Sequence, residues 1–440
     1  MFLVIFSFLL FLFAGSASCE EETANANFER GEAADAFVAF QRDKEIQDAE
    51  KIPYAKAAFY VRRFDIAKAV LSGIPLEERL TKNLEPLLIE CLFRTANKDE
   101  AAKEGKLILD APLKEKVAAA AVFAYFGEGD RAKDLLGESV SLTQPAFVVN
   151  YVKILIYTLQ YDKAESIIKE NMPIFESTGE GLLTYAEFLA RQSKMEEAIG
   201  AAEKGALLEP DNPRITLFLE EREDRLSLLK EKTALIKERI NGGTNLTLKL
   251  SYLRMLVNIV LLEIRSGAGV EEDLKEANKV LEEMNELKEL PEIFLLKGIV
   301  LWYEGLRQAG KSSIVKSLGL DPSYGLASQI LAAFYRFLKD LSSAKTTLEE
   351  GKPYNLQNAS YFGQLSRVYL DLGDLKNALI AIEYAIAVNP NNAELMSTKG
   401  KILLQMNEPE KAKETIEKAL SINPKEPLAI EIKGKLKDKP

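Results

Sequence analysis

The chain contains no histidine and only two cysteines among its 440 residues. Without histidine, a Ser-His-Asp triad, a Cys-His pair and a His-ligated metal site are all excluded. The cysteines, Cys19 and Cys91, are too few for a disulfide framework or for a zinc site made of cysteine alone. Cys91 lies in an apolar run of helical character, which favours a buried structural thiol. The sequence therefore predicts no metal site and no cofactor.

Basic residues are also scarce for a protein that would bind nucleic acid. Lys and Arg number 57 against 67 Asp and Glu, which gives a net charge of −10. Because binding to a phosphate backbone needs a basic face, we expect no nucleic-acid partner. Hydrophobic residues make up 47% of the chain and charged residues 28%, a composition typical of a folded protein rather than a disordered one.

Only one apolar run stands apart, at the N-terminus. Residues 2–14 are apolar except for Ser7, and the run is shorter than the about 20 residues that span a bilayer. Small residues follow at 15–18, as in a secretory signal peptide, although no Lys or Arg precedes the run. We expect a signal peptide at residues 1–18, a polar tether at 19–32, and export to the periplasm or to the surface of a membrane in the cell envelope.

Cys19 directly follows Ala17 and Ser18. This arrangement resembles a bacterial lipoprotein signal, in which the cysteine becomes the lipidated first residue of the mature protein. Ser16 departs from that pattern, since a leucine-like residue is usual at its position. The resemblance implies lipidation of Cys19 and attachment to a membrane through the N-terminal lipid or through an uncleaved signal. The alternative is an ordinary signal peptide cut after Ser18.

The C-terminal part of the chain repeats with a constant period. The repeat is marked by Pro322, Leu356, Pro390 and Pro424, which are evenly spaced. A small residue precedes each marker at a fixed distance, and a second small residue recurs earlier in each unit: Gly310, Ala344, Ala378 and Ala412, and Gly298, Ala332, Ser366 and Gly400. Such self-similarity indicates a stacked array of similar supersecondary units. Small residues at two fixed positions allow two helices to approach closely, and proline ends the second helix.

These units resemble the tetratricopeptide repeat (TPR), a helix–turn–helix of about 34 residues. The copy that ends at Pro390 carries Tyr369, Gly373-Asp374 at the turn, Ala378 and Ile382 at the positions typical of the family. The resemblance implies an all-α fold, namely a right-handed α-solenoid of TPR-like helical hairpins. It also implies a non-catalytic protein that binds protein or peptide partners in a concave groove.

The register of the repeats suggests how the chain is divided. Alanines at the same or a slightly shorter spacing predict degenerate TPR-like repeats over residues 33–211: Ala67, Ala101, Ala132, Ala164 and Ala198. Residues 212–290 lose this phase, which predicts a region of longer helices or a hinge. Regular repeats follow at 291–424, and residues 425–440 read as the polar capping helix that a solenoid needs for solubility.

The first helices of TPR hairpins line the concave face, and certain repeat positions tend to face the groove. Carried over to this sequence, the resemblance nominates nine residues for partner binding: Trp302, Tyr303, Gln329, Arg336, Phe337, Arg367, Asp371, Lys401 and Gln405. Large aromatic and Arg side chains often anchor interfaces. For Trp302 and Phe337 the alternative is burial in the core.

One motif favours a different class of function. Residues 305–312 match G-x₄-G-K-[ST], in which Lys311 would reach nucleotide phosphates and Ser312 would bind magnesium. That motif must follow a strand, whereas here both glycines fit the repeat. The leading hypothesis is therefore an exported scaffold that assists the assembly or tethering of an envelope or secretion complex. The alternatives are a nucleotide-dependent enzyme or regulator that uses Lys311 and Ser312, and an accessory module for polysaccharide export.

Overall fold

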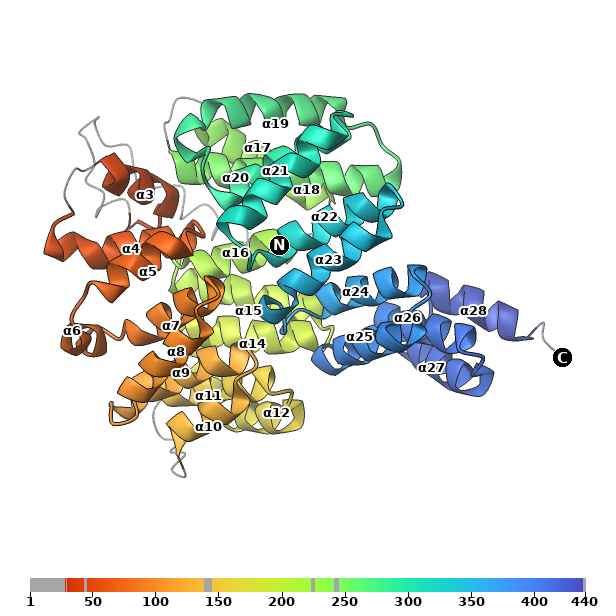
Figure 1. The fold of residues 1–440 in the computed structure, drawn as a ribbon, viewed down its shortest axis with the longest axis horizontal. Helices are drawn as coiled ribbons and strands as arrows, with labels where there is room; N and C mark the ends of the chain where they lie inside the picture. The colour runs from red at the N-terminus through yellow and green to blue at the C-terminus, as the bar shows by residue number, and fades with distance from the viewer. Residues whose placement is uncertain are drawn as a thin grey trace.

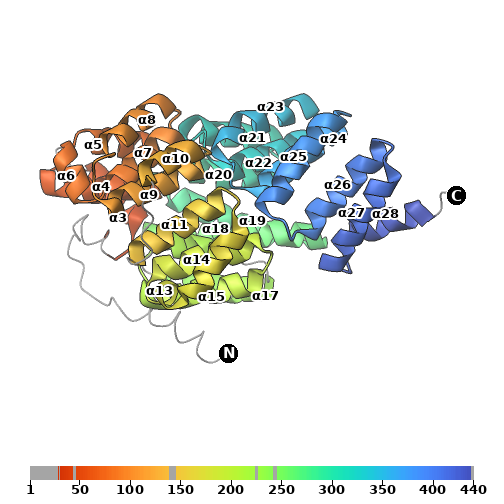
Figure 2. The same cartoon turned by 90° about the horizontal axis from the view of Figure 1, so that it is seen from below.

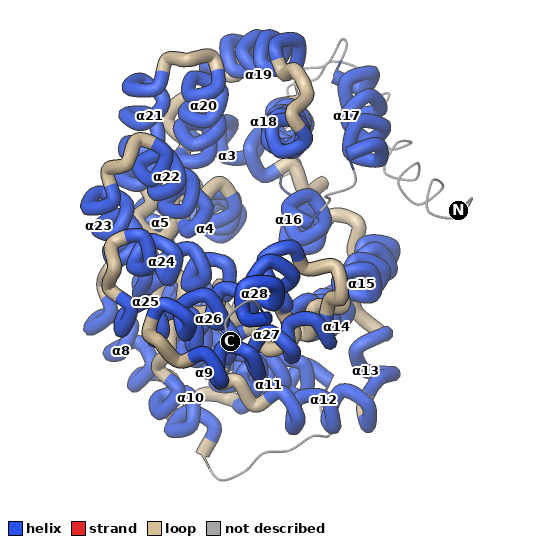
Figure 3. Tube along the Cα trace, turned by 90° about the vertical axis from the view of Figure 1, so that its right-hand side faces the viewer, coloured by secondary structure: helices blue, strands red, loops and turns tan. Residues whose placement is uncertain are grey.

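The computed structural model describes Phe28 and residues 30–42, 46–137, 145–222, 226–240 and 245–437. Over these residues the secondary structure is helical throughout, with no strand (Figures 1 and 3). The predicted all-α fold is confirmed, and the helices form a right-handed α-solenoid. None of the described helices is long and apolar enough to cross a membrane. The predicted signal peptide and Cys19 lie outside the described residues.

Most helices pair in antiparallel hairpins. The hairpins are α4 (Lys51–Tyr60) with α5 (Phe64–Ser72), α7 (Glu85–Arg94) with α8 (Lys98–Leu107), α9 (Leu113–Tyr125) with α10 (Gly129–Leu136), α11 (Pro145–Tyr157) with α12 (Tyr161–Glu170), α14 (Gly179–Arg191) with α15 (Met195–Leu208), α18 (Leu246–Ser266) with α19 (Glu271–Glu283), α20 (Pro291–Tyr303) with α21 (Arg307–Leu320), α22 (Gly325–Phe337) with α23 (Leu341–Gly351), α24 (Ala359–Asp371) with α25 (Leu375–Val388), and α26 (Ala393–Gln405) with α27 (Pro409–Ile422).

The remaining helices start, interrupt or end this series. They are α3 (Ala33–Arg42), α6 (Leu76–Thr81), α13 (Met172–Glu176), α16 (Pro213–Arg222), α17 (Leu226–Ile240) and α28 (Pro427–Lys437), with short 3₁₀ helices at Asp48–Glu50, Asn285–Leu287 and Lys352–Tyr354. α17 packs chiefly against α18 rather than against α16, which precedes it. The hairpin pattern is therefore interrupted between α15 and α18.

Each hairpin turns through one residue in the left-handed region of φ. These residues are Arg62, Ala96, Gly127, Leu159, Ser193, Gly267, Gly305, Lys339, Gly373 and Asn407. After the turn at Gly373, the N–H of Asp374 donates to the carbonyl of Tyr369 at 2.9 Å, which closes the end of the first helix. Except at Gly267, the turn residue lies five positions before the small closing residue that the sequence identifies.

The small closing residues are where the two helices of a hairpin meet. The alanines at this position are fully buried: Ala67, Ala101, Ala132, Ala164, Ala198, Ala344, Ala378 and Ala412. In the α20/α21 hairpin a Cβ on Gly310 would lie only 2.7 Å from the carbonyl oxygen of Gly298. The close approach that the sequence predicts is thus present in both halves of the solenoid.

The solenoid coils so that its second superhelical turn packs against its first superhelical turn (Figure 2). Turns within the early hairpins meet loops between the later hairpins, and Arg62 Nε donates to Asp321 Oδ2 at 2.7 Å. Further contacts join Tyr161 Oη to the Val388 carbonyl at 2.6 Å and Ser193 Oγ to Asn389 Oδ1 at 3.0 Å. Each of these pairs joins an early hairpin to a loop or a helix end in the second half of the chain. The two turns therefore enclose space between them and inside the coil.

α3 closes the first turn against the start of α18. Asp35 accepts hydrogen bonds from the backbone N–H groups of Leu246 and Thr247, both at 2.8 Å. A carboxylate at a helix N-terminus satisfies N–H groups that have no partner within the helix. Arg42 forms an ion pair with Glu286 at the other end of α3. Side chains from the first described helix thus hold a helix from the middle of the chain.

Candidate functional site

The coil surrounds a central hollow of about 1880 Å³. Its walls come mainly from the first helices of successive hairpins, α4, α7, α9, α11, α14, α18, α20 and α22, together with α16 and the residues before α3. Pockets for small ligands are usually about 300–1,000 Å³. The central hollow is therefore large enough to take a segment of polypeptide.

Basic side chains outnumber acidic ones around the central hollow. Ten of the lining residues are Lys or Arg, namely Arg30, Lys56, Arg62, Arg94, Lys153, Arg214, Arg222, Arg239, Arg254 and Arg265. Seven are acidic: Glu32, Glu90, Glu180, Glu187, Asp211, Glu220 and Glu292. The whole chain has the opposite balance, with a net charge of −10. A concave surface of one sign concentrates the opposite sign, so the central hollow favours an acidic ligand.

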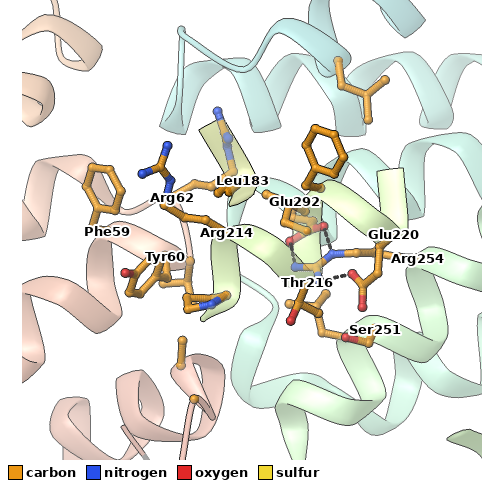
Figure 4. Close-up of a pocket in the computed structure, with 18 of the residues that line it drawn as sticks. Phe59, Tyr60, Arg62, Leu183, Arg214, Thr216, Glu220, Ser251, Arg254 and Glu292 are labelled. Atoms are coloured by element: carbon orange, nitrogen blue, oxygen red, sulfur yellow. Dashed lines mark hydrogen bonds and ion pairs between the residues drawn. The ribbon is translucent and has the colours of Figure 1, made fainter. Parts of the chain in front are cut away.

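Arg254 on α18 sits between carboxylates from α16 and α20. Its Nη1 lies 2.9 Å from Glu220 Oε2, and its Nη2 lies 2.8 Å from Glu292 Oε2 (Figure 4). Burial opposes the charge on Arg254, but the two carboxylates outweigh it and raise the pKa well above its usual range. This pairing joins α16, α18 and α20 into a fixed wall, because either carboxylate would be costly to bury without it.

A second ionic group lies across α11, α14 and α16. Glu180 accepts a hydrogen bond from Arg214 Nη1 at 2.7 Å and forms an ion pair with Lys153. Burial tends to raise the pKa of Glu180, but Lys153 and Arg214 lower it to about 2. Glu187 lies 3.8 Å from Arg214 and accepts a hydrogen bond from Tyr157 at 3.2 Å. Glu180 is therefore ionised at neutral pH, and both carboxylates already have partners within the protein.

Two cations flank two aromatic rings in a ladder along one side of the coil, and Arg94, Tyr125 and Tyr157 of this ladder line the central hollow. The guanidinium of Arg94 lies 5.7 Å from the ring centre of Tyr125, which packs edge-on against Tyr157 at 5.2 Å. Arg191 lies 5.7 Å from the ring of Tyr157. Each of these residues ends the first helix of its hairpin. The ladder fixes four consecutive hairpins relative to one another and gives this side of the coil aromatic faces.

Sequence reasoning missed this ladder, although a signal for it was available. Tyr303, which was nominated, lies seven positions before the closing Gly310. The same count from the closing alanines of the degenerate repeats leads to Tyr60, Arg94, Tyr125, Tyr157 and Arg191. The nominated residues come from the regular repeats alone, whereas most residues that line the central hollow precede residue 291.

The nine nominated residues are not gathered in one place. Gln329 is the one that lines the central hollow, where its Nε2 donates to Ser360 Oγ at 3.2 Å. Trp302 is only 6% exposed and stacks on Phe334 at 3.8 Å, so the structure places it in the core, as the alternative for this residue predicts. Tyr303 is half-buried beside the same ring.

The other nominated residues lie on or near the surface of the later hairpins. Arg336 pairs with Asp371 at 2.5 Å across a small depression of about 580 Å³, which Phe337 also lines. Phe337 is 61% exposed, so for this residue burial in the core is wrong. Arg367 forms an ion pair with Glu394 on α26, and Lys401 and Gln405 are exposed on the same helix.

The phosphate-loop motif forms a hairpin turn and not a phosphate cradle. Gly305 is the left-handed turn residue, and Gly310 lies within α21 with its N–H donated to the Leu306 carbonyl at 2.9 Å. A phosphate loop needs such N–H groups free and needs a strand before it. The preceding element here is α20, and Lys311 lies over the ring of Tyr335. The geometry does not support the alternative built on Lys311 and Ser312.

Residues 369–436 match the family model for the tetratricopeptide repeat. No curated protein is significantly similar to the chain. Among solved structures, YrrB, described as a TPR protein with an unusual peptide-binding site, is 20% identical, covers 41% of this chain and 91% of its own, and has a TM-score of 0.33.

MamA from Desulfovibrio magneticus RS-1 is 22% identical and covers 40% of this chain and 97% of its own, with a TM-score of 0.32. The APC/C hetero-tetramer Cut9-Hcn1 is 13% identical and covers 94% of this chain and 95% of that one, with a TM-score of 0.36. At these identities the similarity concerns the fold of stacked helical hairpins alone.

Proposed function

We propose that this chain, whose C-terminal hairpins match the tetratricopeptide repeat, is a non-catalytic scaffold that binds an extended acidic segment of a protein partner. The observation that carries the proposal is the central hollow, which is lined by the first helices of successive hairpins and carries ten basic against seven acidic side chains. A segment inside the coil would contact several hairpins at once, which suits a ligand that is long rather than compact.

The ionic groups of the walls indicate which side chains can act on a ligand. Arg254, Lys153 and Arg214 are held by carboxylates of the protein itself. Lys56 and Arg265 make no ion pair with a described carboxylate, and both line the central hollow. These two cations can therefore meet an acidic ligand without breaking a wall contact.

Reversing these two charges should weaken peptide binding and leave the fold intact. Random short peptides displayed on phage would first be selected on the purified protein, and the enriched peptides should carry a net negative charge. Lys56→Glu and Arg265→Glu should each lower the affinity of the best peptide by about tenfold, which is about 1.4 kcal/mol. Fluorescence anisotropy measures the affinity.

Lys106→Glu is the matched control, because Lys106 is exposed on α8, the outer helix of its hairpin. It should leave the affinity unchanged within about a factor of two, as salt screens distant surface charges. Enrichment of basic peptides, or equal losses in all three variants, would refute an acidic ligand in the central hollow.

We also propose, from residues 2–19 alone, that the mature protein is exported, is attached to a membrane through Cys19, and helps assemble or tether an envelope or secretion complex. These residues lie outside those that the structure describes. Mass spectrometry of the native protein should find an N-terminus at a lipidated Cys19, and Cys19→Ala should move the protein to the soluble fraction. An intact Met1 on a cytosolic protein would contradict export.

A further inference from the structure

The solenoid has two edges, and the two halves of the chain use them differently. The turn edge consists of the turns between the two helices of each hairpin, and the loop edge consists of the loops between hairpins. In the first turn of the coil, the turn edge from Arg62 to Ser193 is covered by the loop edge from Asp321 to Asn391. This contact between edges is the interface that stacks the second turn of the coil on the first.

In the second superhelical turn, the turn edge is not covered by any other described segment. It presents large apolar side chains: Phe337 is 61% exposed and Leu306 is 56% exposed, and Leu338 and Leu372 of the same edge are also exposed. Arg307 lies over the ring of Phe337 at 4.9 Å. Apolar side chains grouped in this way on a surface mark a site of protein contact.

The loop edge of the first superhelical turn also presents exposed apolar side chains, although Gly31 lies against its last loop at Asp211. Leu208 is 50% exposed at the end of α15, with Leu207 next to it, and Leu107 is 53% exposed at the end of α8, with Leu109 just beyond. One free edge is thus a turn edge and the other is a loop edge, and these are the two kinds of edge that meet in the internal interface.

The repeat register also matches the charges of the two free edges. In the covered interface Arg62, five positions before the closing Ala67, pairs with Asp321, eleven positions after the closing Gly310. By the same counts Lys339 holds the position of Arg62 on the free turn edge, and Glu209 holds the position of Asp321 on the free loop edge. The ionic positions of the internal interface therefore recur on the two free edges.

We propose that the free turn edge of one molecule binds the free loop edge of a second copy, so that the superhelix continues from chain to chain. The occupant is a second copy because the contact continues an interface that the chain already makes with itself. Such a contact is heterologous, since each partner contributes a different surface, and it leaves one edge of each kind open at the ends. This contact between two copies does not depend on peptide binding in the central hollow.

Complementation between two variants tests this arrangement. Phe337→Asp removes the turn edge, and Leu208→Asp removes the loop edge. The wild type should show a mass by sedimentation velocity that rises with concentration, while each variant alone stays at the mass of the monomer. An equimolar mixture of the two should form a one-to-one dimer, because one variant keeps its loop edge and the other its turn edge.

Val315→Asp and Ile380→Asp are matched controls, since both residues are exposed on second helices away from the two edges. Both should associate as the wild type does, and circular dichroism should show all four variants folded. A wild type that remains monomeric, a mixture that fails to dimerise, or loss of association in the controls would each overturn the proposal. Loss of association in Phe337→Asp but not in Leu208→Asp would indicate a symmetric dimer through the turn edge. That result would also overturn the proposal.

Discussion

Replacing Gly310 with leucine should destabilise the protein by at least about 3 kcal/mol, the upper range for an overpacked core. The first added carbon alone would lie 2.7 Å from the Gly298 carbonyl oxygen and 3.0 Å from the backbone nitrogen of Trp302. Both of these are backbone atoms, so no rotamer change can make room and α20 must move away from α21. Thermal unfolding followed by circular dichroism should show a melting temperature lower by several degrees.

Gly319→Leu is the matched control within the same helix, because a Cβ at Gly319 would meet no atom within 4 Å. Leucine is favoured over glycine by up to about 1 kcal/mol in a helix, so this change should be neutral or slightly stabilising. Lys311→Ala should cost within about 0.5 kcal/mol, as expected for a partly exposed side chain at the surface. Equal melting temperatures for the two leucine variants would show that the hairpin does not close at Gly310.

Replacing Asp321 with alanine should cost about 3 kcal/mol and loosen the second turn of the coil from the first. Asp321 is fully buried, and its carboxylate lies 2.6 Å from Arg62 Nη2 and accepts from Ser323 Oγ at 2.6 Å. Without it the Arg62 guanidinium is left against the Tyr324 ring with no anion. Chemical denaturation should report the loss of stability, and small-angle scattering should report a larger radius of gyration.

Asp371→Ala removes a comparable carboxylate from a surface pair, that of Arg336 and Asp371. Exposed pairs of this kind contribute between about 0 and 1 kcal/mol, so the radius of gyration and stability should hardly change. The double variant Arg62→Met with Asp321→Ala should be more stable than Asp321→Ala alone, because no charge is left unpaired. Equal effects of Asp321→Ala and Asp371→Ala would mean that this pair does not join the two turns.

The sequence was sufficient to predict the hairpins, because a hairpin is a local unit. Ala378 predicts the buried contact between two helices, and Gly373, five positions earlier, predicts the turn that joins them. Both requirements act within one repeat, so they recur at a fixed spacing even where the rest of the repeat has diverged, as at Ala132 and Gly127.

The central hollow could not be predicted in the same way. The pairing of Arg62 with Asp321 depends on the small rotation that each hairpin adds to the next, summed over the intervening repeats. Insertions such as α6 and α13, and the packing of α17 against α18, alter that sum and leave no periodic signal. Because the regular repeats are the later hairpins, the residues nominated from them lie there too. Most residues that line the central hollow come from the earlier hairpins.

Site-specific photo-cross-linking tests the central claim, that a partner segment lies inside the coil, most directly. A benzophenone amino acid would replace Tyr125 or Leu261, which line the central hollow, and Val315 or Ile380, which are exposed on second helices. Irradiation with the selected acidic peptide should give cross-links from the two positions in the central hollow, and excess unlabelled peptide should abolish them. Cross-links from the outer positions alone would contradict the account and place the binding surface on the convex face.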